Sequence, residues 1–192
     1  MSGRPAMSPQ IVPLPCSDGE VVSRAQAGES EARRALFLRY APELAALLRR
    51  ILGRSCDVED AVQQAFLTAF EQLPTLSNPN AFRPWIYKLA IRSARRSFWT
   101  LRMREIAWPG GGPESMWTPD DLATGLSADD RAELVLLGQR LARLPLPLRQ
   151  AWVLRYQFDC TLPEAALVSG CSLATIKRRI DEAQRHLEGP KP

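Results

Sequence analysis

The sequence has a single histidine, His186, and four cysteines that stand apart from one another, Cys16, Cys56, Cys160 and Cys171. No CxxC pair occurs, which argues against a zinc site. Nor does any segment group carboxylates for a metal, or place a histidine or cysteine nucleophile beside an orienting base. We therefore expect no metal, no cofactor and no enzymatic activity, and we interpret the cysteines as small buried residues.

Long apolar runs are also missing. No segment reaches the roughly 18 consecutive apolar residues of a membrane span. Near the N-terminus, Pro5, Pro9, Pro13 and Pro15 interrupt any apolar stretch that could form the core of a signal peptide. These absences predict a cytoplasmic protein without membrane insertion of its own, and a flexible tail over residues 1–17.

The excess of positive charge is small, with a net charge of +4 and a pI near 9.1. Such a balance permits a polyanionic partner but does not identify one. The content of 45% hydrophobic and 24% charged residues is ordinary for a soluble globular protein. Only the distribution of the charges along the chain can therefore indicate a partner.

Apolar residues recur at three-to-four-residue spacing and no strand pattern is present, so the sequence predicts an all-α fold. The segment WPGGGPESMWTPDD has no periodicity and predicts a flexible linker over residues 105–126. Two small helical domains, 18–104 and 127–188, flank it. We expect helices over 18–28 (capped by Asp18), 30–52, 57–73 and 81–104, with a loop at 74–80, and then over 127–144, 148–158, 161–170 and 173–187.

The segment from 161 to 187 has the pattern of a helix-turn-helix. Thr161 and Glu164 form a capping box, Gly170 ends the first helix, and Ser172 caps the second. In this motif the second helix enters the major groove of DNA. Apolar residues predicted to join the two helices are Ala165, Ala166, Leu173, Ile176 and Ile180. Residues left to face DNA are Ser172, Ala174, Thr175, Lys177, Arg178 and Arg179. A solvated hairpin with a basic face is the alternative.

Residues 82–104 contain seven basic residues and no acidic one. Trp85, Tyr87, Phe98 and Trp99 lie among them, a mixture that suits phosphate pairing and stacking on unpaired bases. We assign Phe82, Trp85, Ile86 and Leu89 to the core. The candidates for DNA contact are Arg92, Ser93, Arg95, Arg96 and Trp99.

The helix predicted over 57–73 has the opposite charge, with Asp57, Glu59, Asp60 and Glu71 and no basic residue. It would repel DNA and attract a basic protein surface, although acids in a first turn are also common capping residues. An acidic helix next to a basic one suggests two partners on two faces.

The segments VVSRAQAGESEARRALFLRYAPEL, DVEDAVQQAFLTAFEQL and AFRPWIYKLAIRSARRSF resemble, in this order, the sigma-two domain of extracytoplasmic-function (ECF) sigma factors of the sigma-70 family. The segment LPLPLRQAWVLRYQFDCTLPEAALVSGCSLATIKRRIDEAQRHL is similar to their sigma-four domain. The resemblance spans residues 18–187, and it implies a factor that binds core RNA polymerase and directs promoter-specific initiation.

The resemblance also implies roles for individual residues. The acidic helix would dock on the β′ clamp helices through Asp57, Asp60, Gln63, Gln64 and Phe66, of which Phe66 can equally be a core residue. The minus-ten element would be bound and melted by Asn78, Asn80, Arg92, Ser93, Arg95 and Arg96, where Ser93 replaces a common asparagine. Sigma-four would contact the β flap and read the minus-thirty-five element through Ser172, Ala174, Thr175, Lys177, Arg178 and Arg179. An anti-sigma factor is a further implied partner.

Two other interpretations stay open at this point. A helix-turn-helix regulator that acts without polymerase would explain the C-terminal motif but not the acidic helix or the aromatic-basic helix. A protein-interaction module would require the basic helix to be inert. Promoter-specific transcription with core polymerase distinguishes the sigma factor from both.

Overall fold

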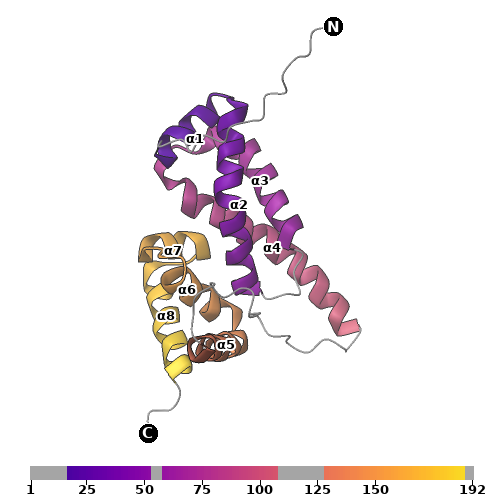
Figure 1. The fold of residues 1–192 in the computed structure, drawn as a ribbon, viewed down its shortest axis with the longest axis vertical. Helices are drawn as coiled ribbons and strands as arrows, with labels where there is room; N and C mark the ends of the chain where they lie inside the picture. Colours follow the sequence, from indigo (N-terminus) through magenta and orange to yellow (C-terminus); the bar gives the residue numbers. More distant parts are fainter. Residues whose placement is uncertain (1–16, 53–57, 108–127, 189–192) are drawn as a thin grey trace.

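The computed structural model describes residues 17–52, 58–107 and 128–188, with side chains up to Arg95 in the second range. In these ranges the chain is helical and contains no strand, which confirms the all-α prediction (Figure 1). The elements are α1 (Asp18–Gln26), α2 (Ser30–Leu52), α3 (Val58–Gln72), η1 (Leu73–Thr75), η2 (Pro79–Ala81), α4 (Phe82–Ala107), α5 (Ala128–Arg143), α6 (Leu146–Tyr156), α7 (Leu162–Ser169) and α8 (Leu173–Glu188).

Helices α1 to α4 form the N-terminal group, in which α3 packs along α4 and α1 packs on α2. Their buried faces follow the apolar spacing of the sequence. The side chain of Gln26 donates to the carbonyls of Leu73 (3.0 Å) and Leu76 (2.8 Å), and so ties the end of α1 to η1. The largest fully buried residues of this group include Leu36, Leu44, Leu47, Leu48, Ile51, Leu73, Phe82, Ile86 and Tyr87.

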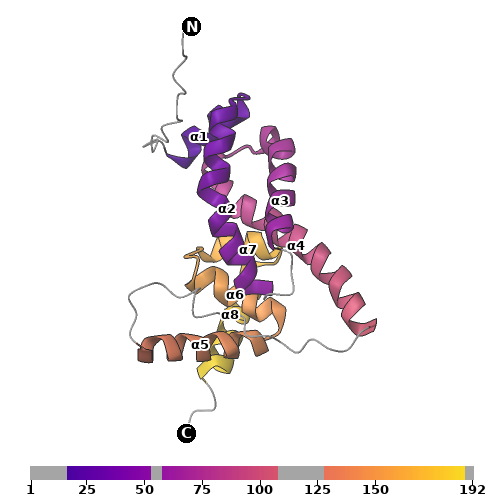
Figure 2. The same cartoon turned by 45° about the vertical axis from the view of Figure 1, so that its right-hand side comes forward.

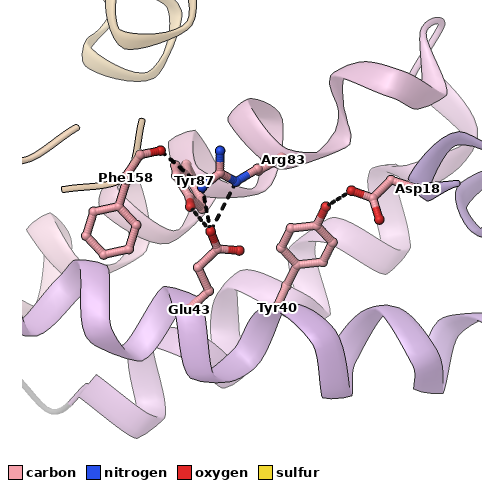
Figure 3. Close-up of polar contacts among 6 residues, drawn as sticks. All are labelled: Asp18, Tyr40, Glu43, Arg83, Tyr87 and Phe158. Carbon is pink, nitrogen blue, oxygen red and sulfur yellow. Dashed lines mark hydrogen bonds and ion pairs between the residues drawn. The ribbon is translucent and has the colours of Figure 1, made fainter. Parts of the chain in front are cut away.

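The start of α1 differs from the prediction. Ser17, not Asp18, caps the helix, because its hydroxyl accepts from the amide of Glu20 and the Glu20 carboxylate accepts from the amide of Ser17 at 3.0 Å. This reciprocal pair is a capping box one residue earlier than expected. Asp18 does not cap the helix and instead accepts a hydrogen bond from Arg39. It accepts a second one from the hydroxyl of Tyr40, which Figure 3 shows.

Two other helix boundaries differ from the prediction, and prolines lie at both. The expected loop at 74–80 contains two 3-10 turns, η1 and η2, each with a proline at its beginning. Helix α6 begins at Leu146 instead of residue 148, with Pro145 at the N-cap and Pro147 in the first turn. Proline fits these positions because the first turn of a helix has no carbonyl partner for its amides.

The C-terminal group, α5 to α8, has its own small cluster of Leu141, Leu144, Leu148, Ala183 and Leu187. Cys160 is buried, and burial raises the pKa of its thiol to about 11. Cys171 is half-buried. For Cys160 the assignment as a buried residue is therefore confirmed, whereas Cys16 and Cys56 lie outside the described residues.

The two groups pack on each other, with α7 against α4 and α6 against the end of α2 (Figures 1 and 2). One continuous cluster of buried apolar residues runs from Val21 in α1 to Ile180 in α8. Arg149 crosses the boundary and donates to the carbonyls of Ile51 (3.1 Å), Ala142 (2.9 Å) and Leu144 (3.2 Å). It thereby satisfies carbonyls at the ends of α2 and α5. The predicted linker falls mostly outside the described residues.

Candidate nucleic-acid interface

The helix-turn-helix is formed by α7, a tight turn and α8. Thr161 accepts from the amide of Glu164, whose carboxylate accepts from the amide of Thr161 at 2.7 Å, which confirms this capping box. Gly170 ends α7 with φ at 64°, in the left-handed region that favours glycine. The amide of Cys171 then donates to the carbonyl of Ala166 at 3.1 Å. The turn is therefore built largely by local hydrogen bonds.

Helix α8 has one buried face, formed by Ile176, Ile180, Ala183 and Leu187. Leu173 was predicted to pack between the two helices but is 44% exposed, and it is the first residue of α8. The opposite face carries the predicted DNA-contacting residues. Ser172, Ala174, Lys177 and Arg178 are exposed, and Thr175 and Arg179 are half-buried.

The polar residues at the start of α8 also have a structural role. The hydroxyl of Ser172 accepts from the amide of Thr175 at 3.2 Å and lies 2.9 Å from its hydroxyl. Within the described residues, Lys177, Arg178 and Arg179 make no hydrogen bond or ion pair. The basic side chains of α8 are thus available to an external partner.

The basic helix α4 has two kinds of cation. Lys88 and Arg92 are exposed, and Ser93 is half-buried. Arg95, in contrast, donates to the side chain of the buried Gln150 at 2.7 Å, and Gln150 donates to Ser169 at 3.1 Å. Arg95 therefore contacts the C-terminal group in this structure. The side chains of Arg96, Phe98 and Trp99 lie outside the description.

Tyr87 was grouped with the stacking residues, but it is fully buried. Its hydroxyl donates to Oε1 of Glu43 (Figure 3). Burial is the main cause that raises the pKa of Tyr87 far above its usual value, and this hydrogen bond is the second. Arg83 donates to the same oxygen through Nε (3.1 Å) and Nη2 (2.7 Å), and to the carbonyl of Phe158 at 3.0 Å. Burial alone would lower the pKa of Arg83. The hydrogen bond to Glu43 is the largest of the effects that raise this pKa, and the net result is a raised pKa.

The cluster of Glu43, Arg83, Tyr87 and Phe158 joins α2 and α4 to the end of α6. The sequence contained a signal for it, because Glu43 is the only acidic residue between Glu31 and Asp57. An isolated acid beside the apolar Leu44 and Leu47 needs a partner. The identity of that partner, 40 residues away, required the tertiary structure.

Helix α3 presents an acidic face with an apolar residue on it. Glu59, Asp60, Gln63, Gln64 and Glu71 are exposed, and Leu67 is 59% exposed. Phe66 points the other way, since it is buried and its ring contacts Phe37 (4.8 Å between centroids) and Phe70 (5.7 Å). Phe66 is thus a core residue, as the sequence allowed, and Leu67 is the exposed apolar residue that the sequence did not single out. Asp57 lies outside the described residues.

The turn ahead of α4 carries the two predicted asparagines, both exposed. Asn78 caps η2, with its side-chain oxygen accepting from the amide of Asn80 at 3.1 Å. Asn80 lies against the first turn of α1. These two residues and the α4 cations come from neighbouring elements, whereas the α8 residues belong to the other group of helices.

No helix in the described part of the chain combines the length and hydropathy that a membrane crossing requires. In the same ranges, histidine, cysteine and carboxylate side chains do not gather in a group of three that could hold a metal ion.

Residues 36–102 match the family model for sigma-70 region 2. Among curated proteins, the chain is 27% identical to the ECF RNA polymerase sigma-E factor of Escherichia coli K12, over 90% of this chain and 93% of that protein. It is 28% identical to the sigma-E factor of Haemophilus influenzae, over 90% and 94%.

Two solved structures have a similar fold. One is CnrH in complex with the cytosolic domain of CnrY, with a TM-score of 0.64, 23% identity, and coverage of 90% of this chain and 96% of that chain. The other is RpoE in complex with the anti-sigma factor NepR from Bartonella quintana, with a TM-score of 0.62, 23% identity, and coverage of 81% and 93%.

The chain therefore resembles RNA polymerase sigma factors of the sigma-70 class, through a region-2 match on α2 to α4 that precedes a helix-turn-helix. The two curated proteins that it is similar to over 90% of its length are ECF sigma factors.

Proposed function

We propose that the chain binds core RNA polymerase and directs promoter-specific initiation in the cytoplasm, without enzymatic activity of its own. The observation that carries this proposal is the presence of two unlike exposed faces on one chain. The face of α3 is acidic and carries the exposed Leu67, whereas the outer face of α8 carries Lys177 and Arg178. A regulator that needs only DNA has no use for the first face.

In this proposal residues 18–104 act as the sigma-two domain, residues 127–188 as the sigma-four domain, and residues 105–126 as their flexible linker. Asp57, Asp60, Gln63 and Gln64, together with Leu67, contact the β′ clamp helices. Binding interfaces typically combine an apolar centre with a polar rim, and on α3 Leu67 supplies that centre. Sigma-four contacts the β flap.

The DNA-binding residues follow from exposure and charge. Asn78, Asn80, Arg92 and Ser93, with Arg96, bind the minus-ten element. Arg95 joins them when its bond to Gln150 is exchanged for a phosphate. The N-terminal half of α8 reads the minus-thirty-five element through Ser172, Ala174, Thr175, Lys177, Arg178 and Arg179. An anti-sigma factor holds the protein inactive, by analogy with the structural relatives solved with CnrY and NepR.

Reconstitution tests the proposal. Purified chain is mixed with core polymerase, and transcripts are mapped on genomic DNA from the source organism; we expect defined start sites that core alone does not produce. Leu67→Ala should weaken association with core, and Leu173→Ala, which removes another exposed leucine, on α8, serves as the control. If the chain binds DNA but never associates with core, the protein is a regulator and not a sigma factor.

A further inference from the structure

Helix α5 packs against the rest of the C-terminal group with one face only. That inner face carries Leu134, Leu137 and Leu141, which belong to the small apolar cluster of this group or pack against it. Figure 2 shows α5 lying across the lower end of the molecule and extending past α8 on one side. The opposite face of α5 points away from the cluster, since its residues lie about half a helical turn from these leucines.

The outer face of α5 is a straight stripe of exposed residues. Asp129, Ala132, Leu136, Gln139 and Arg143 recur at alternating three- and four-residue spacing, and all are exposed. We call these residues the α5 stripe. Leu136, at its centre, is 53% exposed. Three- and four-residue spacing around an apolar centre is the pattern by which one helix packs along another.

The two ends of the α5 stripe carry opposite charges. Asp129 lies in the first turn of α5 and Arg143 in the last. The exposed Glu133 and Arg140 flank the stripe and repeat these signs, although Arg140 also donates to the carbonyl of Leu187 at 3.1 Å. Asp129, Glu133 and Arg143 make no hydrogen bond or ion pair with the described part of the chain. Their charges are therefore left for an external partner.

This arrangement of charges makes the α5 stripe complementary to itself. Asp129 and Arg143 are each seven residues from Leu136, which is about 10.5 Å along the axis at 1.5 Å per residue. In an antiparallel pair with a twofold axis at Leu136, Asp129 of each copy therefore lies opposite Arg143 of the other copy. A parallel pair would instead place like charges together.

We propose that the chain forms a symmetric homodimer through the α5 stripe, with the two α5 helices antiparallel and the Leu136 side chains in contact at the twofold axis. A second copy is the partner that fits, because a twofold interface requires one patch to match itself in both shape and charge. One pair of helices is smaller than a standard interface of about 1,600 Å², so the dimer dissociates in the micromolar range. The inference goes beyond the proposed function, which a monomer can perform.

Sedimentation equilibrium of the full chain, over a series of micromolar concentrations, measures the dimer. We expect the average mass to rise from that of the 21.4 kDa monomer toward twice this value. Leu136→Glu brings two carboxylates together at the axis and should raise the dissociation constant about tenfold or more. Leu38→Glu is the matched control, because Leu38 is 50% exposed on α2, and this variant should dimerise as the wild type does.

Exchange of the end charges tests the antiparallel register. Asp129→Arg places arginines opposite each other and Arg143→Asp places aspartates opposite each other, so each variant alone should be monomeric. When the two variants are mixed, both contacts join an arginine to an aspartate, and a heterodimer should form with about the wild-type affinity. Glu31→Arg in the first turn of α2 and Arg185→Asp in the last turn of α8 are the matched controls and should still dimerise.

A wild-type chain that stays monomeric at every concentration would overturn the proposal, and so would wild-type dimerisation of Leu136→Glu. A mixture of the two charge variants that stays monomeric, while the wild type dimerises, would exclude the antiparallel pair. Circular dichroism confirms that each variant folds. Association with core polymerase is measured separately by gel filtration, so that a failure of the proposed function is distinguished from a failure of the dimer.

Discussion

One oxygen of Glu43 accepts hydrogen bonds from two nitrogens of Arg83 and from the hydroxyl of Tyr87 (Figure 3). A carboxylate in a partly buried position loses hydration, and these three donors replace it. Tyr87 and Arg83 are therefore structural residues, although both lie on the basic helix. The residues of α4 that remain for DNA are the outward ones.

Tyr87→Phe removes one of these donors and keeps the ring. We expect the free energy of unfolding to fall by about 1.5–3 kcal/mol, the usual contribution of a hydrogen bond to a charged group. Urea denaturation measures it. The matched control is Tyr156→Phe, since the side chain of Tyr156 is 52% exposed and no hydrogen bond of its hydroxyl occurs among the described residues. An equal loss in both variants would contradict the role of Glu43.

Among the elements, the turn between α7 and α8 depends on Gly170, whose φ of 64° is unfavourable for other residues. A Cβ at this position would meet no atom within 4 Å, so that the cost of a substitution lies in the backbone alone. Gly170→Ala should lower the free energy of unfolding by about 1 kcal/mol, and Gly170→Asn by less, because asparagine tolerates the left-handed region. Thermal denaturation compares the two, and a larger loss for asparagine would contradict this account.

Helix α8 has cations in its N-terminal half and in its last turn, and they are expected to differ in function. Arg178→Ala or Arg179→Ala should weaken binding of holoenzyme to a minus-thirty-five duplex by about 1–3 kcal/mol if the contact is a bidentate one to a base. Arg185→Ala, an exposed cation in the last turn, should have a small effect. Electrophoretic mobility shifts at fixed salt measure the difference. Wild-type affinity in both Arg178 and Arg179 variants would remove the assignment.

The whole molecule is held together by a core that both helix groups share. Phe158, at the end of α6, packs edge-on against Tyr87 with 5.9 Å between ring centroids, and Cζ of Arg50 lies 5.7 Å from the Phe158 ring. Its carbonyl also accepts from Arg83. A small apolar residue here would leave a cavity between the groups.

Phe158→Ala should therefore lower the free energy of unfolding by about 3–5 kcal/mol and separate one calorimetric transition into two, one for each group. Phe66→Ala, which opens a cavity inside the N-terminal group, should destabilise the protein without that separation. A single transition at an unchanged temperature in Phe158→Ala would show that the two groups do not stabilise each other.

Local signals in the sequence predicted the helices, the capping box of α7, the turn at Gly170 and the outward cations of α8, because each depends on residues within one or two turns. Boundaries at prolines and the N-cap of α1 were less well predicted. There, alternatives one or two residues apart satisfy the same local rules, and Ser17 was preferred to Asp18 only because Glu20 completes its box.

The sequence alone determined that this protein is all-helical and resembles an ECF sigma factor, since charge pattern and motif order are properties of the chain. Only the tertiary structure decided that Arg83 and Arg95 face inward, that Phe66 is core while Leu67 is exposed, and that Gly19 meets Asn80. These outcomes depend on which helices pack together. Contacts between residues 40 or more positions apart leave no periodic trace in the sequence.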